Sequence, residues 1–357
     1  MSKCQKLSFF PLEDLPDEIL LKVLSSLDIK GVLQCGQSST RLRKISNDKS
    51  LWSKLNLRGQ YVPYGLIEKA MQNGCEYLKL IFASSYEKKN SVVPWKLKYL
   101  DISQCELGPM IVNCEGLLQN CHFLEKLSVI DLKLRSSEID QICQNGETLQ
   151  ILSLGGFNQW EWYSRTELIQ RLFTNCHQLT EFNLCSAWDR GMRDAQLWAL
   201  VKNLTPNILK LSLAFSKIKD EHVNTLVLRC KKITELNLKA TSITNDSVES
   251  IVEHLNFLEK LDVSCNNIEV TTLLQLKSIP TLKTLRCFED EGEDEDEEET
   301  EKIKHLKLHL PHVIINEDYL QIARPRLARP RKDSLSNDHD WFWEIRANQQ
   351  NLFPRAR

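Results

Sequence analysis

Cysteine and histidine are the residue types in this chain with the widest possible chemistry, because thiols and imidazoles serve in disulfides, zinc sites and nucleophilic catalysis. The chain has 12 cysteines and 8 histidines, including the adjacent pairs Cys121-His122 and Cys176-His177. Adjacent residues do not supply the geometry of a nucleophile and its base. The sequence contains no Cys-x-x-Cys pair, no His-Glu-x-x-His motif and no glycine-rich phosphate loop. It therefore predicts no catalytic residue, no metal ligand and no cofactor.

Three cysteines are spaced as members of a repeat rather than as a reactive cluster. Cys121, Cys176 and Cys230 each lie three residues before a leucine or isoleucine that opens an apolar run. A small apolar side chain at this point can close the corner between a helix and a strand. We interpret these three cysteines as buried thiols.

The apolar runs follow one pattern, with apolar residues at the first, fourth and sixth positions. The eight copies are Leu97-Leu100-Ile102, Leu124-Leu127-Val129, Leu149-Leu152-Leu154, Leu179-Phe182-Leu184, Ile208-Leu211-Leu213, Ile233-Leu236-Leu238, Leu258-Leu261-Val263 and Leu282-Leu285-Cys287. Their starts lie 24 to 30 residues apart, which is the period of a leucine-rich repeat. Each unit is too small to bury its own apolar face, so neighbouring units must stack into a curved solenoid.

Each repeat also contains a helical half. Segments 220–230 and 245–255 carry apolar residues at the spacing of one helix face, and Asp220 and Asn245 are expected to be their N-cap residues. The predicted fold class is α/β, with parallel strands on the concave side and helices on the convex side. This solenoid follows an N-terminal three-helix unit and precedes a C-terminal tail.

The concave surface is predicted to be small and polar, because residues between the buried positions of a strand point to the opposite face. The residues concerned are Tyr99, Asp101, Ser103, Ser128, Ser153, Gly155, Asn183, Ser212, Ala214, Asn237, Asp262 and Ser264. Four aromatic residues, Phe157, Trp160, Trp162 and Trp188, follow the strands in loops. Packing within the loops and contact with a partner both remain open for them.

The N-terminal unit, 10–57, has a different pattern. Leu15-Pro16-Asp17-Glu18 opens a helix with proline at its first position and acids in its first turn. The apolar residues Ile19, Leu20, Val23, Leu24 and Leu27 then recur on one wide face, and two shorter helical pieces precede Ser50-Leu51-Trp52. A unit of this size can form only a small hydrophobic core. We therefore expect it to pack against the solenoid or a partner.

The opening segment, 15–20, and the closing segment, 48–52, of this unit resemble an F-box, the module that docks on the Skp adaptor of cullin-based ubiquitin ligases. Segments 279–285 and 310–325 are similar to the last repeats and tail of the S-phase kinase-associated F-box proteins. The chain thus resembles the F-box/leucine-rich-repeat family. The adaptor-binding residues that this resemblance implies are Leu15, Pro16, Ile19, Leu20, Val23, Leu24, Leu27, Leu51 and Trp52.

In that family, side chains just after the middle and late strands hold a small cyclin-kinase accessory protein and a phosphorylated substrate. A tryptophan, an acid and an arginine of this pocket fall here on Ser186, Ala240 and Cys265, whereas Lys217 keeps the charge of a second arginine. The resulting expectation for substrate or partner contact is Trp160, Trp162, Trp188 and Lys217.

Charge is segregated near the C-terminal end, although the net charge is only −2. Residues 289–301 contain eleven acids in thirteen positions, which predicts a disordered insertion that is either a solvated loop or a lure for basic partners. Basic clusters at 324–326 and 329–332 follow. The tail carries Trp341, Phe342 and Trp343, and we expect it to fold back onto the concave face. The expected divisions are 1–9 N-terminal tail, 10–57 F-box, 58–288 solenoid, 289–301 acidic insertion, 302–318 terminal repeat and 319–357 tail.

These observations predict a non-catalytic substrate-recognition subunit of a Skp-cullin-F-box ubiquitin ligase. Its expected partners are the Skp adaptor, through it a cullin-RING assembly, a protein substrate from the cell-cycle machinery and an accessory protein of a cyclin kinase. The alternative is a non-ligase acidic leucine-rich nuclear scaffold that binds histones or phosphatases. No apolar run is long enough to cross a bilayer, so we expect no membrane partner. We also expect no nucleic-acid partner. The expected location is nucleus and cytoplasm.

Overall fold

The computed structural model describes residues 15–58, 62, 64–80, 95–103, 115–130, 132, 134–155, 165–185, 192–288 and 297–316. The chain forms two compact units, unit 1 (Met1–Glu125) and unit 2 (Lys126–Arg357). The division falls inside the stretch predicted as one solenoid. Eleven described strands are ordered β1 to β11 as they occur in the chain.

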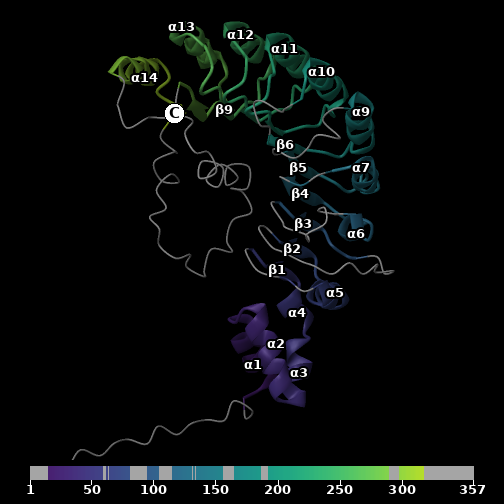
Figure 1. Ribbon diagram of the computed structural model, residues 1–357. Coiled ribbons are helices and arrows are strands. Elements are labelled where there is room, and N and C mark those ends of the chain that lie inside the picture. Colours follow the sequence, from purple (N-terminus) through teal and green to yellow (C-terminus); the bar gives the residue numbers. More distant parts are fainter. Residues whose placement is uncertain are drawn as a thin grey trace, which may run out of the picture. The chain divides into compact units, whose positions relative to one another are not determined.

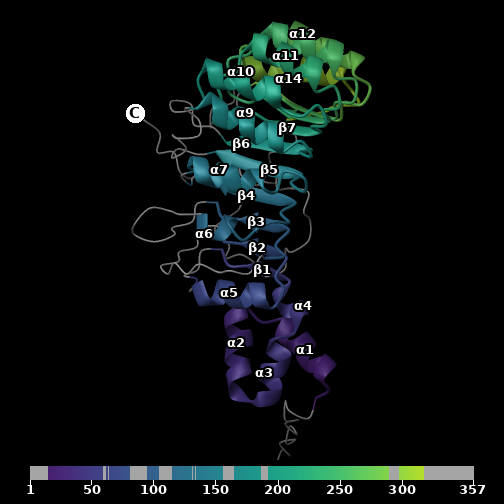
Figure 2. The same ribbon diagram turned by 90° about the vertical axis from the view of Figure 1, so that its right-hand side faces the viewer.

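Unit 1 begins with short helices and continues into the first strands. Its elements are α1 (Asp17–Ser25), α2 (Ile29–Ser38), α3 (Thr40–Ser46), α4 (Lys49–Trp52), β1 (Lys54–Asn56), α5 (Tyr64–Gln72), β2 (Tyr77–Lys79), β3 (Tyr99–Asp101) and α6 (Glu115–Leu118). Helix α3 contacts both α1 and α2, as Figure 2 also shows. Strands β1, β2 and β3 pair in parallel, and Leu55, Leu78 and Leu100 lie in register.

Local sequence sets where the helices of unit 1 begin. Helix α1 starts at Asp17, so Pro16 is its N-cap residue rather than its first residue as predicted. Asp17 and Glu18 lie in the first turn, where the helix dipole favours acids. The Arg41 Nε donates to Asp17 Oδ1 at 2.8 Å, which joins α3 to the start of α1.

Unit 2 alternates strands with helices. Its elements are β4 (Lys126–Ile130), α7 (Ser136–Cys143), β5 (Ile151–Gly155), α9 (Thr166–Asn175), β6 (Glu181–Cys185), α10 (Asp194–Asn203), β7 (Lys210–Ser212), α11 (Asp220–Arg229), β8 (Glu235–Asn237), α12 (Asn245–His254), β9 (Lys260–Asp262), α13 (Val270–Leu273), the 3-10 helix Leu274–Ser278, β10 (Thr284–Arg286), α14 (Glu297–His309) and β11 (Ile314–Ile315). The predicted α/β fold class is confirmed.

Strands and helices occupy opposite sides of unit 2. Figure 1 shows β4, β5, β6 and β9 on the inner side of an arc and helices α7 and α9 to α13 on its outer side. Neighbouring strands from β4 to β11 pair in parallel, and Leu211, Leu236 and Leu261 face one another in register. These three side chains are buried, as the repeat predicts. The core of unit 2 therefore lies between its strands and its helices.

The corner thiols are buried, as predicted. Cys121, Cys176 and Cys230 are each fully shielded from solvent. Burial raises the pKa of Cys121 to about 12 and that of Cys230 to about 11. Both therefore remain neutral thiols at physiological pH.

The predicted N-cap role of Asp220 and Asn245 is wrong, because both are the first residues of their helices. Each side chain instead bonds to the start of the next repeat's helix. The Thr244 N–H and hydroxyl donate to Asp220 at 2.8 and 2.9 Å, and the Glu269 N–H donates to Asn245 Oδ1 at 2.9 Å. Partial burial opposes ionisation of Asp220, yet donation from Ser247 and Thr244 outweighs it and lowers its pKa.

The predicted disordered acidic insertion over 289–301 is wrong for residues 297–301. These residues begin α14. Leu306 lies within this helix and Leu310 directly follows it, and both side chains are fully buried. Burial of this apolar pair ties the helix to the end of the sheet and overrides the repulsion expected within an acidic run. Residues 289–296, the loop tryptophans and the tail 319–357 lie outside the described residues.

The close packing of α2 on α3 yields the first prediction. A Cβ on Gly36 would collide with the Ser46 hydroxyl and lie 3.2 Å from its Cβ, so Gly36→Ala should lower the free energy of unfolding by about 1–3 kcal/mol. Gly65→Ala in α5 is the matched control, because a Cβ there meets nothing within 4 Å. Urea denaturation of the full chain measures both, and equal midpoints for the two variants would contradict the packing.

A buried histidine links helices α10 and α11. The His222 Nδ1 accepts a hydrogen bond from the Lys219 N–H at 3.2 Å, and its Nε2 lies 3.4 Å from Asp194 Oδ1. Its ring lies 4.4 Å from that of Trp198. Burial lowers the pKa of His222, although Asp194 and Glu221 partly oppose this effect. The folded state therefore favours the neutral ring.

The lowered pKa gives stability a predictable pH dependence. The unfolded imidazole binds a proton below its ordinary pKa of 6.5 while the folded one does not, so stability should fall as pH drops from 7.5 to 5.5. His222→Gln should flatten this fall, because glutamine keeps an acceptor for the helix start but does not titrate. Urea denaturation midpoints at pH 7.5 and 5.5 measure the loss of stability. The same loss in His222→Gln as in the wild type would contradict the role of His222.

Candidate functional site

The first candidate surface is an apolar stripe on α1. Ile19, Val23 and Leu27 lie four residues apart along the chain, which places them on one side of the helix and its C-terminal end. They are 45%, 39% and 40% exposed, although each is a large aliphatic residue. Neighbouring exposed aliphatic side chains of this kind mark a protein-contact surface. We call these three residues the α1 stripe.

The remaining residues predicted for adaptor binding have other surroundings. Leu20 and Leu24 are 1% and 2% exposed, and they belong to the core of unit 1. Trp52 is fully buried, and its Nε1–H donates to the Ser46 carbonyl at 2.7 Å. Leu15 and Leu51 are half-buried, and Pro16 is exposed. The structure thus separates the predicted set into a core group and a surface group.

The strand residues predicted to line an open polar surface are buried instead. They include Asp101, Ser128, Ser153, Asn237 and Asp262. Several serve the strand ends: Asp101 accepts from the Ser103 N–H at 3.0 Å, and Asn237 accepts from the Lys239 N–H at 3.0 Å. Such a bond from a side chain to the backbone two residues later is a turn contact of Asx type. It holds the chain where it leaves the strand.

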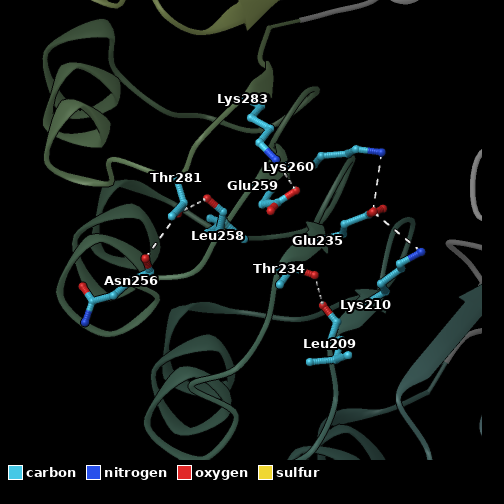
Figure 3. A network of polar contacts seen from close by, with 10 residues as sticks. All are labelled: Leu209, Lys210, Thr234, Glu235, Asn256, Leu258, Glu259, Lys260, Thr281 and Lys283. Carbon is cyan, nitrogen blue, oxygen red and sulfur yellow. Dashed lines mark hydrogen bonds and ion pairs between the residues drawn. The ribbon is translucent and has the colours of Figure 1, made fainter.

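A row of charged residues lies on the same side of the strands as these buried polar residues, two positions earlier in each strand. Glu181, Lys210, Glu235 and Lys260 are the first residues of β6, β7, β8 and β9 and lie in register. Lys210 Nζ lies 3.2 Å from Glu181 and 3.7 Å from Glu235, and Lys260 Nζ lies 3.5 Å from Glu235. Figure 3 shows Glu235 between its two lysines. We call these four residues the charge row.

Polar contacts continue beside the charge row. The Lys283 Nζ lies 2.9 Å from Glu259, and the Thr234 and Thr281 hydroxyls donate to the Leu209 and Leu258 carbonyls at 3.1 and 2.8 Å (Figure 3). Sequence reasoning missed the charge row because, apart from Tyr99, it followed only residues that come after the second apolar position of each repeat. The alternation of sign at the residue just before the second apolar position was the available signal.

The loops after the strands contain a recurring left-handed residue. Positive φ angles of 59°, 51° and 56° occur at Phe215, Ala240 and Cys265. Their N–H groups donate to the next repeat's Lys239, Ser264 and Phe288 carbonyls at 2.8–2.9 Å. These hydrogen bonds join successive repeats, so the left-handed conformation serves the stacking of repeats. Ala240 and Cys265 are also two of the positions that the resemblance assigns to the family's pocket.

Among the residues predicted for substrate contact, Lys217 is exposed in the loop after β7. Trp160, Trp162 and Trp188 lie outside the described residues. In the described part of the chain no three metal-ligating side chains come together. Within the same residues, no helix combines the length and the apolar character needed to cross a membrane.

Comparison with known proteins assigns the family. A family model described as "SKP2 LRR domain" matches residues 65–349, and a model described as "F-box-like" matches residues 12–58. The chain belongs to the SKP2-type leucine-rich-repeat family. With its F-box-like N-terminal region it is an F-box/leucine-rich-repeat protein, so the predicted resemblance is confirmed.

Two individual proteins are similar to this F-box/leucine-rich-repeat protein. F-box protein SKIP17 of Arabidopsis thaliana is 23% identical over 286 residues, which cover 77% of this chain and 54% of that protein. The chain thus spans about half the length of that curated relative. A chain in the crystal structure of the mouse RP105/MD-1 complex is 16% identical with a TM-score of 0.37, covering 61% of this chain and 38% of that one. A likeness this low supports no argument.

The charge row leads to a stability prediction. Lys210→Met would leave the half-buried Glu181 and Glu235 facing each other without the lysine between them, which should cost about 1 kcal/mol or more. Lys283→Met removes a more exposed pair and should cost less than about 0.5 kcal/mol. Urea denaturation at low and high salt measures both, and the Lys210 loss should change with salt because ions screen the two carboxylates. Equal losses in both variants would contradict a role for the row.

Proposed function

We propose that this protein is the substrate-binding subunit of a Skp-cullin-F-box ubiquitin ligase. The observation that carries the proposal is the α1 stripe, an exposed apolar surface on a helix within the F-box-like region. An adaptor that covers Ile19, Val23 and Leu27 removes from water the aliphatic surface that the fold itself leaves open. The leucine-rich repeats would hold the target.

The proposed mechanism is proximity without chemistry by this chain. The adaptor connects the protein to a cullin-RING assembly and its ubiquitin-loaded enzyme. Holding a target in the same complex raises the effective concentration of its lysines near the activated ubiquitin. The acceleration then comes from positioning, and this chain needs no catalytic residue of its own.

The finer proposal concerns the target. We propose a phosphorylated protein of the cell cycle as substrate, with a cyclin-kinase accessory protein as a further partner, in nucleus and cytoplasm. Exposed Lys217 supports it, because an ammonium group in a loop after a strand attracts phosphate. Affinity purification with mass spectrometry, repeated on phosphatase-treated extract, tests whether the bound proteins depend on phosphate.

The adaptor contact is tested by charge on the α1 stripe. The double variant Ile19→Asp, Val23→Asp should weaken binding of the purified Skp adaptor by about 100-fold or more, because each buried carboxylate would lack a partner. Both positions are exposed, so the fold should survive, and circular dichroism checks this. Leu20 and Leu24 are unsuitable sites, because their substitution would destabilise unit 1 itself.

Leu228→Asp is the matched control, since Leu228 is also an exposed aliphatic residue on a helix, at 49%, but belongs to α11. It should leave adaptor binding unchanged. Full binding by the folded double variant would remove the ligase proposal. Retention of histones or phosphatases by the wild type without the adaptor would favour a nuclear scaffold instead.

A further inference from the structure

Two thiols from neighbouring repeats meet in unit 2. Cys143 is the last residue of α7, and Cys176 directly follows α9. The Cys143 side chain lies against the C-terminal half of α9, with its Sγ 3.8 Å from the Arg171 carbonyl oxygen. Cys176 is fully buried, whereas Cys143 is partly open to solvent. One accessible and one inaccessible thiol therefore lie at the neighbouring ends of α7 and α9.

The sequence of the corner explains why this pair forms here. Cys121, Cys176 and Cys230 occupy the position three residues before a strand's first apolar residue, and Gly146 takes that position in the repeat that contains Cys143. A Cβ on Gly146 would collide with the Asn175 carbonyl, so the two corners pack backbone to backbone. Because Gly146 has no side chain, the thiol of this repeat comes from Cys143, about one turn earlier in the chain.

The surrounding charges distinguish the two sulfurs. Donation from Cys176 lowers the pKa of Cys143, and nearby Arg171 adds to this while burial and Asp140 oppose it. The same hydrogen bond and burial raise the pKa of Cys176. Arg171 Nη1 lies 2.7 Å from Asp140 Oδ1, so an ion pair joins the helices on which the thiols lie. Cys143 is therefore the sulfur that ionises first.

We propose that Cys143 and Cys176 are a peroxide-sensitive thiol pair that closes into a reversible disulfide between adjacent repeats. The Cys143 thiolate attacks one oxygen of hydrogen peroxide; the S–O bond forms, the O–O bond breaks and hydroxide leaves, giving a sulfenic acid. Cys176 then attacks the Cys143 sulfur; the S–S bond forms, the S–O bond breaks, and the departing hydroxide takes the Cys176 proton as water. Two thiols are oxidised by two electrons and one peroxide is reduced to two waters.

Other described thiols lack this combination. Cys121 and Cys230 are fully buried, and burial raises their pKa values to about 12 and 11. Cys75 is buried as well, with its pKa raised to about 12. A buried neutral thiol is a poor nucleophile toward peroxide. Oxidation should therefore begin at Cys143 before it reaches any of these three.

The test treats the folded full-length chain with a small molar excess of hydrogen peroxide, blocks free thiols with N-ethylmaleimide and digests with trypsin. The sequence gives peptides 136–165 and 172–190, which contain Cys143 and Cys176. Mass spectrometry should find these two peptides joined, with fragment ions that place the bridge at Cys176 rather than Cys185. Dithiothreitol should separate them, and the oxidised protein should melt at a higher temperature than the reduced one.

Cys143→Ala is the decisive variant, because its site is partly exposed and the change should leave the fold intact. It should abolish the joined peptide and the rise in melting temperature, whereas Cys35→Ser, at a partly exposed cysteine in α2, should change neither. Cys176→Ala should also abolish both, with circular dichroism to confirm folding. Conversion of Cys143 to sulfinic acid without a bridge, a bridge to Cys185, or a bridge formed only in urea would each overturn the proposal.

Discussion

The central leucine of strands β7, β8 and β9 is buried only because neighbouring repeats cover it. Leu211, Leu236 and Leu261 pair side by side and are shielded from water, which no single repeat of about 25 residues could achieve alone. Stacking therefore has to be in register along the whole strand. The backbone bonds confirm this, since the Leu213 N–H donates to Asn237 and the Leu238 N–H to Asp262 at 2.9 and 2.8 Å.

Several features that look independent follow from that register. Left-handed residues after the strands keep the ladder of backbone bonds running beyond the last leucine. Asp220 and Asn245 fasten the helix of one repeat to the start of the next. The charge row exists because first strand residues from four repeats are brought together at strand spacing. Unit 1 differs, because three aliphatic side chains spaced four residues apart, the α1 stripe, are left uncovered there.

The periodicity of apolar residues predicted the repeat architecture well. It failed where two adjacent apolar residues fit the same helix face, and where a contact joins different repeats. The spacing of Leu211, Leu236 and Leu261 located the strands because burial is repeated at a fixed interval. The same reasoning could not separate Leu20 from Ile19, since adjacent apolar residues on a wide helix face differ only in what packs against them. Asp220 has the composition of a cap, but its acceptors point to another repeat, a long-range contact that local preference does not contain. The helical start of α14 within the acidic run was likewise set by Leu306 and Leu310 further along.

The alternating signs of the charge row have an evolutionary meaning. Repeat proteins lengthen or shorten by duplication and loss of whole units, since any interface can replace another of the same register. Here the pattern Glu181, Lys210, Glu235, Lys260 recurs only after two repeats. Loss of the single repeat that carries Glu235 would set Lys210 against Lys260, whereas loss of two adjacent repeats would restore opposite signs. The heritable module in this part of the solenoid is thus a pair of repeats, and parity constrains how its length can change.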